Sequence, residues 1–270
     1  MSFGAQLPAR RSRALPLWLP VVVGSASLWS CGSPRSLDVP TLSVAVAANF
    51  AEAHGELALL FELATGARVV SSKGATGGLY AQIRNGAPFD IFLAADAMRP
   101  RLLEEEGLGV PGTRFTYATG RLALYGPGLD SVRSGGIDLS SAGVTNLAIA
   151  NPRTAPYGVA AEVVLGRVGL NPTARSRIVR GANVGQTLQF VRSGAAELGF
   201  VALSQVVGEP EHSYWLVPSE YHAPLLQDAL LLRAGEENPL ARDYLAFLRS
   251  DEAKRVIESF GYEIRLRSDP

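Results

Sequence analysis

The chain has 270 residues, 47% of them hydrophobic, so it is long enough to build two hydrophobic cores. Its 25 Lys and Arg residues balance its 25 Asp and Glu residues, and the formal net charge at pH 7 is zero. Because no excess of positive charge would attract a polyanion, we expect neither nucleic acid nor an anionic membrane surface as a partner.

The first 36 residues have the composition of an export signal followed by a short tether. Arginines at positions 10, 11 and 13 precede a mostly apolar segment, residues 14–28. Because a bilayer-spanning helix needs roughly 20 apolar residues, this pattern predicts a cleaved signal instead of a permanent anchor helix. The single cysteine ends Leu28-Trp29-Ser30-Cys31, which is similar to the lipobox of bacterial lipoproteins. We therefore expect a periplasmic or other extracytoplasmic location, with Cys31 either lipidated or incidental.

Four segments of the chain share one pattern, in which an apolar strand runs into a short loop that opens a helix. The first strand, residues 42–47, reaches its helix through Ala48-Asn49. The second, around Val69-Val70, reaches its helix through the loop 73–77, which contains Thr76. We expect Asn49 and Thr76 to cap these helices, because short polar side chains accept hydrogen bonds from the first helical N–H groups.

The next elements continue this alternation of strand and helix. An apolar strand is expected at residues 91–95 and a helix at 100–107, whose Glu104, Glu105 and Glu106 are typical of a solvated face. The order βαβα predicts an α/β fold with a mostly parallel sheet that binds ligands at the carboxyl ends of its strands.

The middle of the chain contains the other two loops of this kind. Apolar strands at 121–125 and 146–150 flank a glycine- and serine-rich loop, residues 126–143. The third loop, residues 155–158, and the fourth, residues 181–185, then each precede a helix. The two expected helices cover residues 159–168 and 186–191.

The chain is expected to cross twice between two lobes. A first crossing is expected near residues 118–121, and the apolar run 229–232 with the amphipathic helical region 239–260 would return to the first lobe. Two crossings imply a hinge. The expected division is a leader and tether at 1–36, a first lobe at 37–119 with 226–270, and a second lobe at 120–225.

The four loops offer hydrogen-bond donors for an anion. Asn49 and Thr76 have donor side chains, Tyr157 has a hydroxyl, and Val184 offers its main-chain N–H. Each helix N-terminus adds about half a positive charge, so converging N-termini would form an anion site without arginine or lysine. We expect Lys73 to face solvent, where its charge would steer anions.

These loops contain no carboxylate that could accept a proton from the ligand. A protonated anion such as hydrogen phosphate needs an acceptor, whereas a fully ionised tetrahedral dianion needs donors only. The pattern therefore favours molybdate, tungstate or sulfate over phosphate.

Several short motifs carry a resemblance to a known family. The specific ones are Val46-Ala47-Ala48-Asn49-Phe50, Gly74-Ala75-Thr76-Gly77, residues 82–92 and Ala155-Pro156-Tyr157-Gly158, with weaker ones at 199–204 and 260–262. Across most of residues 41–262 the chain resembles the molybdate-binding proteins that serve ATP-driven importers.

This resemblance implies a two-lobed type II periplasmic binding protein fold, α/β with mixed, mostly parallel sheets and a hinge. It implies molybdate or tungstate as ligand, no cofactor or separate metal site, an ABC transporter permease as partner, and a monomer. The implied ligand contacts are Asn49, Thr76, Tyr157 and Val184. Many relatives have serine in place of Asn49 and Thr76. Some have tyrosine in place of Ala202, a hydroxyl that Tyr157 would replace.

Other interpretations stay open from the sequence. The four residues could serve only in helix capping and packing, with Asp90 a turn residue. An enzyme acting on a sulfated or phosphorylated compound could use a similar anion site, but His54, His212 and His222 lack metal-ligand spacing and no Gly-x-Ser-x-Gly motif is present. A sensor domain, or a carrier of sulfate or another oxyanion, would share the same loops.

Overall fold

The computed structural model describes residues 39–126, 129, 144–168 and 177–264. The expected leader with Cys31 and most of the expected loop at 126–143 lie outside the described residues. Among the described residues, no helix is long and apolar enough to cross a membrane.

The first sheet has the strand order β2-β1-β3-β10-β4. Its first three strands are parallel, and β10 runs antiparallel to both β3 and β4. The strands are β1 (Thr41–Ala47), β2 (Arg68–Gly74), β3 (Ile91–Leu93), β4 (Phe115–Gly120) and β10 (Leu225–Leu231).

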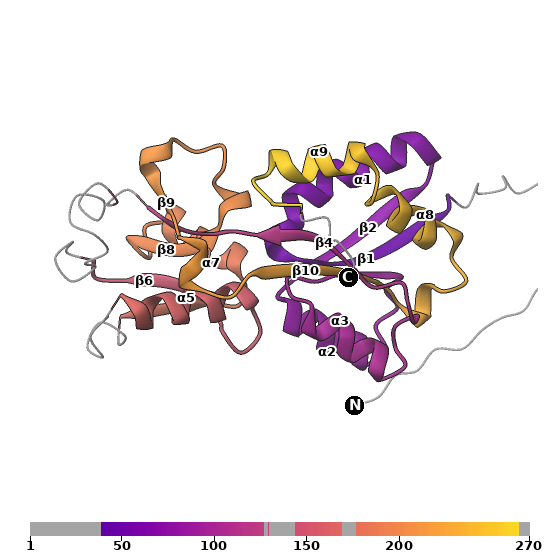
Figure 1. Ribbon diagram of the computed structural model, residues 1–270, viewed down its shortest axis with the longest axis horizontal. Coiled ribbons are helices and arrows are strands. Elements are labelled where there is room, and N and C mark those ends of the chain that lie inside the picture. Colours follow the sequence, from indigo (N-terminus) through magenta and orange to yellow (C-terminus); the bar gives the residue numbers. More distant parts are fainter. Residues whose placement is uncertain (1–38, 127–128, 130–143, 169–176, 265–270) are drawn as a thin grey trace, which may run out of the picture. The chain divides into compact units, whose positions relative to one another are not determined.

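Helices cover both faces of this sheet (Figure 1). On one face α1 (Ala51–Thr65), α8 (Pro239–Phe247) and α9 (Asp251–Ser259) pack into a core with the strands. On the other face lie α2 (Thr76–Arg84) and α3 (Met98–Glu105). Both faces of β1 and β3 are therefore buried, which explains their continuous apolar sequences.

The second sheet has the strand order β7-β6-β8-β5-β9 and is also mixed. Its β6 pairs in parallel with β7 and β8, while β5 is antiparallel to β8 and β9. The elements are β5 (Leu122–Tyr125), β6 (Leu147–Ala150), α5 (Pro156–Arg167), β7 (Ile178–Gly181), α7 (Val184–Arg192), β8 (Leu198–Ala202) and β9 (Tyr214–Leu216). Two mixed sheets with flanking helices confirm the predicted α/β class.

The chain passes between the sheets twice, once from β4 to β5 through Arg121 and once from β9 to β10. We call the parts built on the first and second sheet the first and second lobe. Short 3-10 helices occupy several connections among the described residues. They are η1 (Ala48–Phe50), η2 (Leu203–Gln205), η3 (Glu211–Ser213), η4 (Ser219–Tyr221) and η5 (Arg233–Gly235).

Several predicted boundaries were wrong for identifiable reasons. Lys73 and Gly74 belong to β2 instead of a loop, because they pair with the end of β1. The helices predicted to start at residues 159 and 186 begin at Pro156 and Val184. Proline is well suited to a first helical position because it has no N–H to leave unpaired.

The predicted helical region 239–260 is two helices, α8 and α9. Residues 248–250 separate them, and the Ser250 hydroxyl accepts a hydrogen bond from the Ala253 N–H at 3.1 Å. This bond caps α9 and lets the chain change direction between the two helices. The amphipathic character that the sequence predicted is therefore divided between two short helices.

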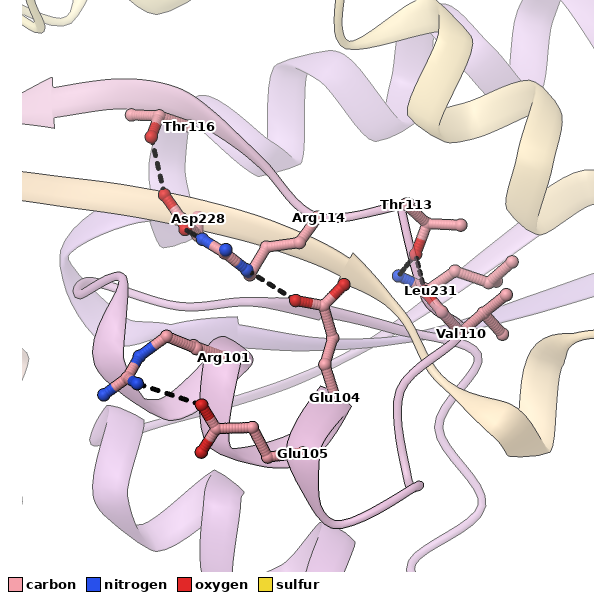
Figure 2. A network of polar contacts seen from close by, with 9 residues as sticks. All are labelled: Arg101, Glu104, Glu105, Val110, Thr113, Arg114, Thr116, Asp228 and Leu231. Atoms are coloured by element: carbon pink, nitrogen blue, oxygen red, sulfur yellow. Dashed lines mark hydrogen bonds and ion pairs between the residues drawn. The ribbon is translucent and has the colours of Figure 1, made fainter.

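The acidic triplet on α3 is only partly a solvated face. Glu104 accepts a hydrogen bond from Arg114 Nε at 2.7 Å, and Arg114 also binds the buried Asp228 at 2.7 Å (Figure 2). Thr116 donates to the same carboxylate at 2.7 Å. This network ties α3 to β4 and β10, so Glu104 has a structural role that charge pattern alone did not predict.

Candidate oxyanion site

The structure brings the four predicted site residues to one small cavity. Inside this cavity the centre of a water-sized sphere can occupy a volume of about 10 Å³. A cavity of this size suits a compact ion and not an organic solute. None of the described residues around it has a charged side chain. The lining residues are Ala47, Ala48, Asn49, Gly74, Ala75, Thr76, Ala95, Ala155, Pro156, Tyr157, Asn183 and Val184.

Helix N-termini surround this cavity. The short helix η1 begins at Ala48, and α2, α5 and α7 begin at Thr76, Pro156 and Val184. The first N–H groups of a helix have no partner within the helix, and the helix dipole makes this end partly positive. The cavity is therefore electropositive although none of the described residues that line it has a charged side chain.

Thr76 has a hydroxyl that is prepared to donate. Its side chain is 1% exposed, and Oγ accepts a hydrogen bond from the Ala95 N–H at 3.1 Å. Among the described residues no acceptor is recorded for the hydroxyl hydrogen, so it is available for a ligand oxygen. The predicted capping role was wrong, because Thr76 is the first helical residue and makes no cap hydrogen bond.

Asn49 uses its side chain within the protein. Its Nδ2 donates to Gln227 Oε1 at 2.9 Å and to Tyr262 Oη at 3.0 Å, which accounts for both amide hydrogens. No side-chain cap is formed at η1 or α1, so the predicted capping role was wrong here too. Asn49 lines the cavity and is 3% exposed, and with both amide hydrogens used it can donate to a ligand only through its main-chain N–H.

Tyr157 is in the first turn of α5 and lines the cavity, but its hydroxyl contacts residues that do not line it. Gln227 Nε2 donates to Tyr157 Oη at 3.2 Å, and a Cβ at Gly120 would lie 2.1 Å from the same atom. Neither Gln227 nor Gly120 lines the cavity. Burial raises the pKa of Tyr157 well above its usual value, so the hydroxyl stays neutral.

Val184 is the first residue of α7 and is 3% exposed. The preceding Asn183 caps the helix by accepting from the Gln186 N–H at 3.0 Å. The cap uses the N–H of the third helical residue and leaves that of Val184 unpaired. The valine side chain packs into the second-lobe core, so this residue can act on a ligand only through its main chain.

A network of buried polar side chains behind the cavity was missed from the sequence. Ser204 donates to the Asn49 main-chain oxygen at 2.9 Å, and Tyr262 donates to that oxygen at 2.8 Å. Tyr117 donates to Gln227 at 3.1 Å. One signal was present in the sequence: Gln227 is a polar residue inside the apolar run of β10, which indicates a specific buried partner.

Two flanking residues behave as the sequence predicted. Lys73 is exposed and does not line the cavity. Asp90 is structural, because its carboxylate accepts a hydrogen bond from the Ser43 N–H at 2.6 Å. Within the described part of the chain, no group of three or more His, Cys, Asp or Glu residues could hold a metal ion.

Comparisons with known proteins show the family of this chain. The profile of the family described as bacterial extracellular solute-binding protein matches residues 42–263. The chain is 44% identical over 248 residues to the molybdate-binding protein ModA of Azotobacter vinelandii, covering 91% of this chain and 97% of that one. It is 43% identical over 218 residues to ModA of Rhodobacter capsulatus, covering 81% of this chain and 86% of that one.

A solved structure of the Azotobacter vinelandii periplasmic molybdate-binding protein superposes with a TM-score of 0.78 at 39% identity. The match covers 83% of this chain and 99% of that chain. The chain therefore belongs to the bacterial extracellular solute-binding proteins and, within them, to the family of periplasmic molybdate-binding proteins.

Proposed function

We propose that this protein captures molybdate, and also tungstate, outside the cytoplasm and delivers it to an ABC importer. The observation that carries the proposal is a cavity with hydrogen-bond donors and no charged side chain, at the N-termini of helices from both lobes. The names of its close relatives supply the identity of the anion.

The proposed contacts are the Thr76 hydroxyl and the main-chain N–H groups of Asn49, Tyr157 and Val184. Hydrogen bonds to a charged group contribute about 1.5 to 3 kcal/mol each. The four contacts together give about 6 to 12 kcal/mol and each helix dipole about 0.3 to 2 kcal/mol, which is of the order of the roughly 8 kcal/mol of micromolar binding plus the ordering costs. The neutral donors are thus sufficient to hold a dianion.

Discrimination against phosphate follows from the same donors. Hydrogen phosphate carries a proton that needs an acceptor, and none of the described residues that line the cavity has a carboxylate. Inserting a protonated anion would leave its O–H without a partner in a buried site, which is costly. We therefore propose selectivity for fully ionised tetrahedral anions.

The remaining parts of the proposal concern the whole chain. The leader would direct export, with a lipid anchor at Cys31 as the membrane attachment, and the mature protein would act as a monomer with a permease as partner. The lobes would divide at 119/120 and 225/226, at the last residue of β4 and the first of β10, and the two adjacent crossings between the sheets would form the hinge.

The experiment is a calorimetric titration of residues 37–270 with molybdate, tungstate, sulfate and phosphate. We expect tight binding of the first two anions and no heat from phosphate. Tight sulfate binding would indicate a sulfate carrier. Binding without a transport defect on deletion would indicate a sensor. Turnover of a sulfated or phosphorylated compound would indicate an enzyme.

Val184→Pro tests a main-chain contact directly. Proline is tolerated at the first position of a helix, and Asn183 already has the extended conformation that must precede it. Because the substitution removes the N–H and keeps most of the apolar side chain, we expect molybdate affinity to fall about tenfold. Val184→Ala, which keeps the N–H, is the matched control in the same titration and should bind nearly as wild type. Equal affinity of the two variants would remove this N–H from the site.

A further inference from the structure

Gln227 lies behind the cavity and joins two of its walls. Its side chain is 0% exposed, and it does not line the cavity. Oε1 accepts from Asn49 Nδ2 at 2.9 Å, while Nε2 donates to Tyr157 Oη at 3.2 Å. One amide thus connects a residue of the first lobe to a residue of the second.

The surrounding backbone is shaped to hold this amide in place. The register between β10 and β4 shifts between Gln227 and Asp228, so that Tyr117 on β4 is an extra residue at this point. The Tyr117 hydroxyl donates to Gln227 Oε1 at 3.1 Å and also lies 3.2 Å from the Ala94 carbonyl oxygen. Both the oxygen and the nitrogen of the Gln227 amide are therefore hydrogen-bonded, which fixes its orientation.

Because Gly120 has no side chain, the Gln227 amide and the Tyr157 hydroxyl can occupy the space beside it. A Cβ at this position would lie 2.1 Å from Tyr157 Oη and 2.5 Å from Gln227 Nε2. Gly120 also ends β4, one residue before the chain crosses to the second sheet. The contact between Gln227 and Tyr157 consequently sits beside the first crossing between the lobes.

We propose that Gln227 is a positioning residue for oxyanion binding. By accepting from Asn49 and donating to Tyr157, it holds the cavity walls of the two lobes at the separation that encloses the anion. The inference rests on the proposed function and deepens it, because it names a residue that sets affinity without touching the ligand.

The amide of Gln227 has both of the groups that this position needs. Asn49 Nδ2 needs an acceptor and the Tyr157 oxygen accepts a donor, so only a side chain with both groups satisfies the pair. Because the bridge spans the two lobes, its loss should mainly speed release of the bound anion. Association, which begins from separated lobes, should change less.

Gln227→Met removes the hydrogen bonds to Asn49 and Tyr157, together with the one from Tyr117, at nearly constant side-chain volume. We expect molybdate affinity to fall about tenfold by calorimetry, with most of the change in the dissociation rate by stopped flow. Tyr157→Phe breaks the same bridge from its other end and should also weaken binding. The double variant should bind no more weakly than Gln227→Met alone, because both substitutions remove one interaction.

The neighbouring Asp228 provides a matched control. It is buried on the same strand, 1% exposed, but its carboxylate binds Arg114 and Thr116 (Figure 2), neither of which lines the cavity. Asp228→Asn should lower the melting temperature and leave molybdate affinity unchanged. This control separates loss of fold stability from loss of positioning.

The outcomes distinguish the inference from the function on which it rests. If the wild-type protein does not bind molybdate, the proposed function is wrong and the inference falls with it. If the wild type binds and Gln227→Met lowers only the melting temperature, Gln227 is structural and the inference alone is overturned. Should Gln227→Met not fold, Tyr157→Phe decides: wild-type affinity and release rate in that variant would overturn the bridge.

Discussion

Replacing Thr76 with valine is expected to weaken molybdate binding about a hundredfold, or about 3 kcal/mol. Valine has nearly the shape of threonine, so the loss isolates the hydroxyl. In the structure this hydroxyl is buried and accepts from the Ala95 N–H at 3.1 Å, which leaves its own hydrogen to donate. A hydroxyl that already accepts a hydrogen bond is also a better donor, because hydrogen bonds in a chain polarise one another.

The measurement is a calorimetric titration of Thr76→Val beside Thr76→Ser. Serine keeps the hydroxyl, so this variant should bind within a fewfold of wild type. The valine variant should also lose about 1 kcal/mol of stability, since the buried Ala95 N–H no longer has its acceptor. If the valine variant binds as tightly as the serine variant, Thr76 does not contact the anion.

The second large effect concerns stability in acid, and it arises from His54. This histidine belongs to α1 and is fully buried, with hydrogen-bond partners on β2 and α8. One ring nitrogen lies 2.8 Å from Ser71 Oγ and the other 2.8 Å from Tyr244 Oη. Burial, and secondarily the charge of Lys73, lowers the pKa of His54 to about 4.

The sign of the pH effect follows from this shift. Below pH 6.5 the unfolded chain binds a proton at His54, whereas the folded protein does so only below about pH 4. The free energy of unfolding should therefore fall by about 3 kcal/mol as the pH drops from about 6.5 to about 4, and this contribution should level off below that. Above pH 6.5 His54 contributes no pH dependence.

Urea unfolding between pH 7.5 and 4 measures this effect. His54→Gln retains a polar side chain but does not titrate, so the difference between its slope and that of wild type isolates the histidine. His212→Gln, at an exposed position, is the control for the substitution itself. Identical slopes for His54→Gln and wild type would contradict the proposed neutral state of His54.

Much of the fold and the convergence of the four loops could be predicted from local sequence. Strands such as β1 have continuous apolar sequences, and each is followed by a loop and a helix. The N-terminus of every such helix has a partial positive charge. Because the carboxyl ends of parallel strands share one edge of a sheet, the loops that contain Asn49 and Thr76 had to be neighbours. The cavity shows that Tyr157 and Val184 join them from the second lobe.

The directions of the side chains could not be predicted, because they depend on residues far away in the sequence. Asn49 looked like a donor for the ligand, but its amide donates to Gln227 and Tyr262, which are 178 and 213 positions away. The Tyr157 hydroxyl likewise meets Gln227, 70 positions away. Local propensity identifies a residue that can donate, whereas tertiary packing decides to which acceptor it donates.

The most direct test of the central claim is a crystal structure of the protein with molybdate, using the anomalous scattering of molybdenum to locate the ion. We predict one strong molybdenum peak in the cavity, with ligand oxygens within hydrogen-bond distance of the Thr76 hydroxyl and of the Val184 N–H. A molybdenum peak at another site, with this cavity unoccupied, would contradict the account.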